Sequence, residues 1–329
     1  MISIKKTLKP LYIKYSVLKF CLREYEYLIR HIGSSNTLES KGKMKYSLLK
    51  QSHVIEKGLS LKDVKLGFGV PKILSLLDDL EQYYQKYQDQ EMLFYVLSIV
   101  RQYLDFHVSN NFDADDGIKR KYEKLAKKLK EDADTDFEKY RGGTLTKGKS
   151  QVSGASFDYR AFVQSRHSIR TFKEGPVSRE DICRALEMAE STPSACNRQP
   201  WLVYVRTKKE NIVKILDMQT GARQFKEQVA AIIVIASTAE AFSLTEAHQP
   251  YLNAGLYAMN LMLAFHSLGL GTIPLNLGIE DRRLSSIKKE LGMPDDALPV
   301  LMLAIGQIPE TLKVACSRRF DFNEYTYFD

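Results

Sequence analysis

Residues 229–237, VAAIIVIAS, constrain the fold more than any other stretch of the chain. The run is continuously apolar up to its last residue and rich in β-branched side chains, which is typical of a strand covered on both faces. WLVYVR (201–206) and PVLMLAIG (299–306) also read as strands, whereas residues 180–191 and 253–271 have helical spacing. Strands that alternate with helices predict an α/β or α+β domain, with helices on both faces of one sheet.

The first 150 residues follow a different pattern, with helical spacing and no strand signal. Apolar residues recur at helical intervals in five segments, at residues 10–32, 44–58, 71–84, 91–108 and 115–131. The stretch RGGTLTKGKSQVSGAS (141–156) is rich in Gly, Ser, Thr and Lys, a linker composition. We therefore predict a helical domain over 1–141, a linker over 142–156 and a second domain over 157–329.

Composition bounds the class of protein. Apolar content of 44% and charged content of 27% are ordinary for a soluble globular chain. No run of about 18 uncharged apolar residues predicts a membrane span, and lysines interrupt the N-terminal apolar stretches, unlike a secretory signal. We expect a cytoplasmic protein without membrane association. The four cysteines have no paired short spacing, so we expect neither a metal site nor a disulfide framework; they are Cys21, Cys183, Cys196 and Cys316.

The net charge of +8 lies entirely in the N-terminal part of the chain. Residues 1–150 carry 28 Lys and Arg against 20 Asp and Glu, whereas residues 151–329 carry 20 of each. Such asymmetry can mark an acidic partner. The charges are scattered and mixed in sign, however, which favours solvated helix surfaces. Nucleic acid is not expected as a partner, because we find neither interleaved aromatic and basic residues nor helix-turn-helix spacing.

Four short segments of the second half are candidates for chemistry. SRHSIRTF (165–172) and CSRRF (316–320) each hold a pair of arginines, and guanidinium groups match phosphate oxygens bidentately. GLGTIPLNLG (269–278) follows a long apolar helix, and we expect its backbone N–H groups to be free of a strand ladder. STPSACNRQPW (191–201) is a constrained loop with two prolines, short polar residues and the only Trp.

In their order and spacing, these four segments resemble the FMN-dependent nitroreductase family over about residues 157–322. The resemblance implies an α+β fold, a three-layer α/β/α sandwich preceded here by the all-helical domain. It also implies a homodimer with two FMN molecules at the subunit interface. NADH or NADPH would reduce flavin N5, and an oxidised small-molecule acceptor would then take the same ring face, which gives ping-pong kinetics. The cofactor carries the chemistry in such enzymes, so no catalytic side chain is expected.

Carried over position by position, the resemblance names candidate cofactor-binding residues. The phosphate and ribityl chain would be held by Arg166, His167 and Ser168, with Arg170, Arg318 and Arg319 as further phosphate ligands. From the other subunit, the flavin ring would be contacted by Pro193, Ser194, Ala195 and Asn197. The opposite side of the ring would be lined by Pro274, Leu275, Asn276 and Leu277.

Two departures and two alternatives remain open. Asn276 stands where many family members carry an acidic residue, and residues 238–251 are short where the family often has a long helical insertion. The helical domain is a candidate for the missing lid. One alternative function is a flavin-dependent dehydrogenase or oxidase of a specialised biosynthetic intermediate. The other is a flavin-bound dimeric scaffold whose basic helical domain binds an acidic partner.

Overall fold

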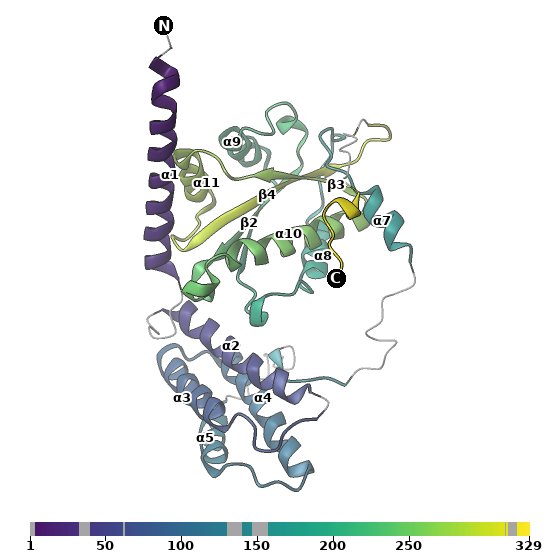
Figure 1. Cartoon of the computed structure of the whole chain (residues 1–329). Helices are drawn as coiled ribbons and strands as arrows, with labels where there is room; N and C mark the ends of the chain where they lie inside the picture. Colours follow the sequence, from purple (N-terminus) through teal and green to yellow (C-terminus); the bar gives the residue numbers. More distant parts are fainter. Residues whose placement is uncertain are drawn as a thin grey trace. The chain divides into compact units, whose positions relative to one another are not determined.

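The computed structural model of the chain describes residues 4–32, 40–61, 63–129, 140–146, 157–312, 314 and 321–329 (Figure 1). The chain forms two compact units. The helical unit contains residues 1–155 together with two short segments of the second half, 193–200 and 238–253. The sheet unit contains residues 156–192, 201–237 and 254–329. The predicted linker, 142–156, lies outside the described residues from 147 onward, so the predicted domain boundary stays a prediction.

The helical unit is built on α1 (Ile4–His31), α2 (Lys41–Leu59), α3 (Val70–Tyr87), α4 (Gln90–Ser109) and α5 (Asp116–Ala126). Side chains cap the starts of three of these helices: Ser40 accepts from the N–H of Lys43, Asp89 from that of Met92 and Asp115 from that of Ile118. These caps satisfy N–H groups that a helix leaves unpaired at its first turn.

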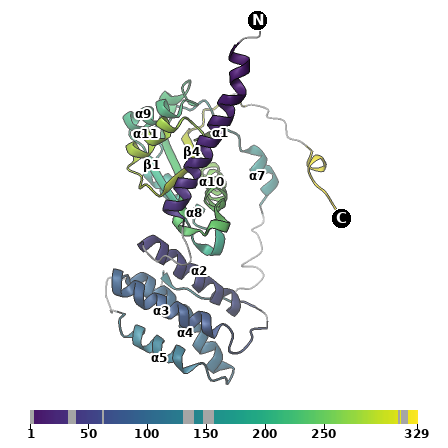
Figure 2. The same cartoon turned by 60° about the vertical axis from the view of Figure 1, so that its left-hand side comes forward.

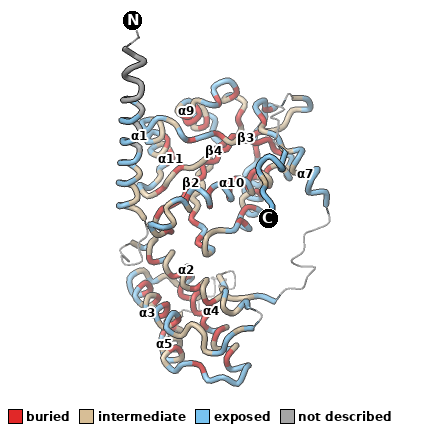
Figure 3. Tube along the Cα trace, viewed as in Figure 1, coloured by how far each residue is buried: buried red, intermediate tan, exposed pale blue. Residues whose placement is uncertain are grey.

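The core of the helical unit lies between α2, α3, α4 and α5, whose inward faces are buried (Figure 3). Its largest buried side chains include Leu48, Leu80, Tyr83, Leu93 and Tyr103. The spacing of these residues is helical, as the sequence predicts, and the described part of residues 1–155 contains no strand. The prediction of an all-helical N-terminal region is confirmed.

The sheet unit holds a four-stranded sheet of β1 (Trp201–Arg206), β2 (Ala231–Thr238), β3 (Leu270–Asn276) and β4 (Ala297–Gln307), in the order β1-β2-β4-β3. β1 pairs antiparallel with β2, and β3 pairs antiparallel with β4. The helices of this unit are α7 (Tyr159–Ser165), α8 (Arg179–Ala189), α9 (Lys209–Gln219), α11 (Asp281–Leu291) and, from residue 254 onward, α10 (Gln249–Ser267).

Alternate residues of β2 point to opposite faces of the sheet, and both faces are covered. Ile232 and Val234 pack with the buried residues of α9 and α11. Ile233 and Ile235 pack with those of α8 and α10. The result is three layers, helices on either side of one sheet, which can be followed in Figures 1 and 2. This confirms both the interpretation of residues 229–237 and the α+β, three-layer α/β/α fold.

The expectation for residues 269–278 is wrong in one respect. β3 forms a ladder with β4 from the pair Leu270–Gln307 to the pair Asn276–Leu301, so backbone groups of this segment are engaged. β3 is, however, an edge strand. Its outer edge is free to accept the chain around Ser168, which forms an isolated parallel bridge with Thr272.

Candidate functional site

The segment after α7 is fastened to the edge of the sheet. The backbone N–H of Ile169 donates to the carbonyl of Thr272 at 3.0 Å, next to the bridge made by Ser168. One turn earlier, the hydroxyl of Ser165 lies 2.7 Å from Nε2 of His266 on α10. These contacts hold residues 165–169 between α10 and β3.

Arg166 sits in this segment with an unsatisfied donor. Its Nη1 atom is buried and has no hydrogen-bond partner among the described residues. A buried guanidinium N–H without an acceptor is costly, and native proteins rarely leave one so. We therefore expect the Nη1 group of Arg166 to donate to an acceptor outside the described residues. An anion would accept this hydrogen bond and also neutralise the positive charge of the guanidinium.

The pKa of His266 supports the same interpretation. Burial lowers this pKa below its usual value, and the charges of Arg166 and His167 lower it further, against an opposing hydrogen bond that the ring donates to the backbone of Phe162. His266 is therefore neutral near pH 7 and does not neutralise an anion by itself. Arg166 and His167 thus both lie near His266 at this end of β3, where their basic side chains favour an anion such as phosphate.

The predicted site residues on β3 and directly after it would contact a ligand mainly through their backbone groups. The side chains of Leu275 and Leu277 are buried in the apolar layer under α9 and α11, and Pro274 is half-buried. Asn276 is exposed, but its Oδ1 accepts the N–H of Gly278 at 2.6 Å.

The loop 193–200 belongs to the helical unit and is locally constrained. Within and after the short 3₁₀ helix η2 (Ala195–Asn197), Cys196, Asn197 and Gln199 have φ of 52°, 51° and 48°. Non-glycine residues in this left-handed region are strained and persist only where neighbouring contacts enforce them. One such contact is the N–H of Ala195, which donates to Oδ1 of Asn253 at 2.9 Å.

Arg198 is the anchor of this loop and was not among the predicted site residues. Its side chain is 2% exposed and reaches both carboxylate oxygens of Glu246, at 2.6 and 3.1 Å. It also donates to the carbonyls of Ala195 and Ala241, at 2.8 and 2.5 Å. Mainly through Arg198, the pKa of Glu246 is lowered to about 2. The ion pair between Arg198 and Glu246 could not be predicted from sequence spacing, because Glu246 lies on a separate segment of the chain.

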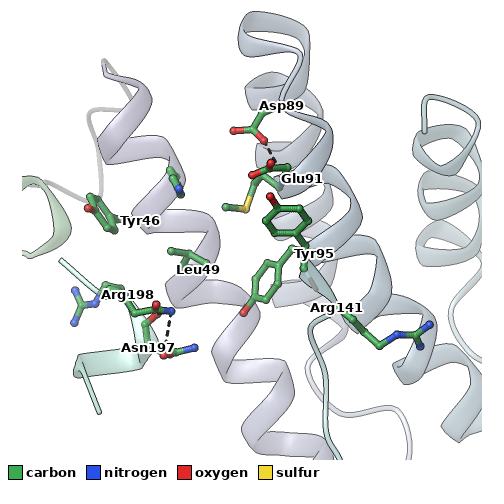
Figure 4. Close-up of a pocket in the computed structure, with 12 residues that line it drawn as sticks. Tyr46, Leu49, Asp89, Glu91, Tyr95, Arg141, Asn197 and Arg198 are labelled. Atoms are coloured by element: carbon green, nitrogen blue, oxygen red, sulfur yellow. Dashed lines mark hydrogen bonds between the residues drawn. The ribbon is translucent and has the colours of Figure 1, made fainter. Parts of the chain in front are cut away.

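A cavity of about 460 Å³ opens beside this loop, within the helical unit (Figure 4). α2 and α4 supply walls of the cavity, and residues 197–199 supply another. It is lined by Lys45, Tyr46, Leu49, Asp89, Glu91, Met92, Tyr95, Tyr140, Arg141, Asn197, Arg198 and Gln199.

The remaining candidates are distributed as follows. Arg170 is exposed, and Arg318 and Arg319 lie outside the described residues. Pro193, Ser194, Ala195 and Asn197 belong to the helical unit, whereas the residues around Arg166 and β3 belong to the sheet unit; a site that joins them stays a prediction.

Within the described ranges, no cluster of His, Cys, Asp and Glu is arranged to hold a metal ion. The helices seen there are also too short or too polar to cross a membrane.

Comparison with known proteins gives consistent matches in the second half of the chain. The model of the nitroreductase family matches residues 163–233 and 214–307. Among curated proteins, a putative NADH dehydrogenase/NAD(P)H nitroreductase of Archaeoglobus fulgidus is 27% identical over 154 residues, 44% of this chain and 82% of that protein. A protein of the same description from Methanothermobacter thermautotrophicus is 26% identical over 153 residues, 46% of this chain and 78% of that protein.

Among solved structures, an FMN-dependent nitroreductase from Clostridium difficile is 24% identical, with a TM-score of 0.45, over 51% of this chain and 98% of that one. The putative nitroreductase ydfN from Bacillus subtilis is 19% identical, with a TM-score of 0.47, over 52% and 99% of the two chains.

Proposed function

Because its second half carries a nitroreductase-family oxidoreductase domain, we propose that this chain is an FMN-dependent oxidoreductase that passes electrons from NADH or NADPH to an oxidised small molecule. The observation that carries the proposal is the buried, unpartnered Nη1 of Arg166. It lies at the position that the family resemblance assigns to the flavin phosphate. The residues present therefore fit the group they would hold.

Each part of the chain has a definite task in this proposal. Arg166, His167 and Ser168 bind the phosphate and ribityl chain at the edge of β3. Arg170 is a further phosphate ligand, together with Arg318 and Arg319 from the C-terminal segment. The charge-assisted bonds from guanidinium to phosphate are among the strongest a protein surface offers.

The flavin ring would rest between two kinds of surface. Pro193, Ser194, Ala195 and Asn197 of one subunit would form a stiff platform, because contacts with Arg198 and Asn253 hold the backbone of this loop. The strand end Pro274, Leu275, Asn276 and Leu277 of the other subunit lines the ring edge with backbone groups. Because the two surfaces come from different subunits, the proposed site requires a homodimer.

When bound, FMN supplies the hydride acceptor and donor at N5. The chain itself contributes position, charge and exclusion of water. Nicotinamide and acceptor would occupy the same face of the ring in turn, which gives ping-pong kinetics. The names of the curated relatives, which include NAD(P)H, support a nicotinamide as donor.

Anaerobic stopped-flow mixing of the flavin-loaded protein with NADH, and separately with NADPH, tests this function. We expect the flavin absorbance to bleach with at least one of them and to return when an acceptor is added. Loaded protein that neither nicotinamide bleaches would contradict the proposal.

A further inference from the structure

The cavity beside the loop 193–200 has the size of a small-molecule site. Its volume of about 460 Å³ lies within the roughly 300–1,000 Å³ usual for ligand pockets. The walls from α2 and α4 come from a part of the chain that the nitroreductase family model does not match. Any selectivity that these walls impart therefore comes from outside the matched family domain.

Aromatic and apolar side chains dominate part of the lining. Three phenol rings, of Tyr46, Tyr95 and Tyr140, border the cavity together with Leu49 and Met92. Figure 4 shows Tyr46 and Leu49 on one side and Tyr95 on the other. Burial raises the pKa of Tyr95 above its usual value, so its hydroxyl stays protonated. Such walls favour a flat ring, which can pack face or edge against phenols.

The charged side chains that line the cavity differ in how many partners they already have. Asp89 already accepts the hydroxyl of Tyr83 at 2.8 Å and the N–H of Met92 at 3.0 Å, with Lys41 at 3.7 Å. Glu91 lies in the first turn of α4, where the helix N-terminus offsets a negative charge. The ammonium group of Lys45 has no ion pair or hydrogen bond within the described residues. The cavity therefore offers an uncommitted cation.

We propose that this cavity binds the electron acceptor, and that the acceptor is a planar aromatic compound with an anionic substituent. Its ring packs among Tyr46, Tyr95 and Tyr140, and its anionic group pairs with Lys45. The inference rests on the proposed function, because it needs Asn197 at the flavin. In the overall step the acceptor gains two electrons and two protons, a hydride from NAD(P)H and a proton from solvent.

Isothermal titration of the flavin-loaded full chain with 2-naphthoate, and with the neutral 2-naphthamide, tests the site without turnover. Lys45→Gln is expected to weaken naphthoate binding about threefold to fivefold, the scale of one exposed ion pair, and to leave the amide unchanged. Lys57→Gln, an exposed lysine of α2 outside the cavity lining, is the matched control. Leu49→Trp, which fills the cavity, is expected to abolish binding of both compounds.

Flavin absorbance on the same samples separates two failures. Loss of flavin from the unmutated chain would count against the proposed function. Retained flavin, with naphthoate affinity unaltered by Lys45→Gln or Leu49→Trp, would overturn the cavity assignment alone.

A second inference comes from α1, whose two faces differ. Tyr15, Leu18, Leu22, Tyr25 and Ile29 are 64, 58, 53, 61 and 62% exposed. Their spacing alternates between three and four residues, the heptad spacing of a coiled-coil seam. An exposed apolar stripe of this extent marks an interaction surface.

The opposite face of α1 is the one turned toward its own chain. Glu24, Tyr27, Leu28 and His31 are half-buried there, and Glu24 contributes to the raised pKa of Tyr251. The exposed stripe is thus a separate face of the helix from the half-buried one.

Charge distribution along α1 indicates which helix pairs with it. Residues 4–19 carry five lysines and no acid, whereas both acids of the helix, Glu24 and Glu26, lie nearer its C-terminal end. Parallel pairing of two copies would bring the lysine-rich ends together, and like charges at that range repel. Antiparallel pairing separates them and lets Leu18 face Leu22 of the partner subunit. We infer that α1 pairs antiparallel with α1 of a second copy.

Cross-linking of the full chain tests this contact. In the antiparallel register Cys21, which is exposed, lies beside Cys21 of the partner subunit. A short bismaleimide is expected to join two copies at Cys21. Leu22→Glu should remove this product, whereas Arg30→Gln, on the flank of the helix, should keep it.

Absence of the Cys21 product, or its survival in Leu22→Glu, would overturn the pairing. Binding of the stripe to phosphatidylserine vesicles without a Cys21 product would assign it to a membrane surface instead.

Discussion

Arg198 and Arg166 both carry buried guanidinium nitrogens, and these nitrogens have opposite surroundings. Arg198 has a carboxylate and two carbonyls as partners, so it is a structural anchor. Arg166 has a buried nitrogen with no partner in the described chain. The sequence motif alone draws attention to Arg166 and passes over Arg198, because a motif records residue types and cannot show which donors are already satisfied.

Replacing Arg166 with Gln should weaken FMN binding by about tenfold to a hundredfold, the loss expected for one charge-assisted hydrogen bond of roughly 1.5–3 kcal/mol. The flavin-to-protein absorbance ratio after dialysis measures this. Arg160→Gln, an exposed arginine of α7, is the control and should retain flavin. Equal flavin content in the two variants would show that Arg166 does not bind the phosphate.

Glu246→Gln should destabilise the helical unit by about 2 kcal/mol, measured by urea unfolding. Removing one partner of a buried ion pair costs roughly 3–5 kcal/mol, and the 25% exposure of the Glu246 side chain reduces this. Because the folded pKa of about 2 lies below the unfolded value, the stabilisation is complete above about pH 4.5. This stabilisation should disappear as the pH falls toward 2. If Glu246→Gln and the unmutated chain lose stability equally in acid, the result would contradict the pairing.

His266 should report phosphate binding through its pKa. In the free protein this pKa is lowered, so the unfolded chain binds its proton more readily and stability should fall as the pH drops below about 6.5. A bound phosphate offsets the charges of Arg166 and His167 and should raise the pKa of His266. Its ring resonances in NMR titrations with and without FMN measure the shift; a pKa that FMN leaves unchanged would argue against phosphate at this place.

Individual elements of the sheet were predictable to different degrees. β2 was clear from its run of β-branched residues, because a strand buried on both faces needs apolar side chains at every position. β3 was less clear, since Pro274 lacks the N–H that a ladder uses. The structure resolves this by placing β3 at the sheet edge, where proline is tolerated.

Close packing at the end of β4 can be tested by adding a methyl group there. A Cβ on Gly306 would lie 2.7 Å from the ring of Phe172, so Gly306→Ala should destabilise the sheet unit by about 1–3 kcal/mol through overpacking. A Cβ on Gly255 of α10 would have no neighbouring atom within 4 Å. Gly255→Ala should therefore stabilise by up to about 1 kcal/mol, the helix propensity difference. Thermal unfolding of both variants checks the contrast, and a shift of the same sign in both would contradict it.

At the scale of the whole molecule, the sequence predicted the helical first part and the three-layer second part. It did not predict that segments 193–200 and 238–253 would pack with the helical unit. That grouping depends on pairs such as Ser40 and Glu240, whose side chains meet at 2.9 Å although 200 residues separate them. Neither periodicity nor composition encodes contacts of such separation.

The left-handed backbone at Cys196, Asn197 and Gln199 was equally hidden, because these residue types do not demand it. The cavity beside the loop follows from the same grouping, so it too could be found only in the folded chain.

The proposed function depends most on a phosphate held at Arg166, and equilibrium titration of the flavin-free full chain with FMN and with riboflavin tests this directly. The two ligands share the ring and differ in the phosphate. We predict that FMN binds at least about tenfold more tightly than riboflavin, in line with one charge-assisted contact. Equal affinity for the two, or no binding of FMN at all, would contradict it.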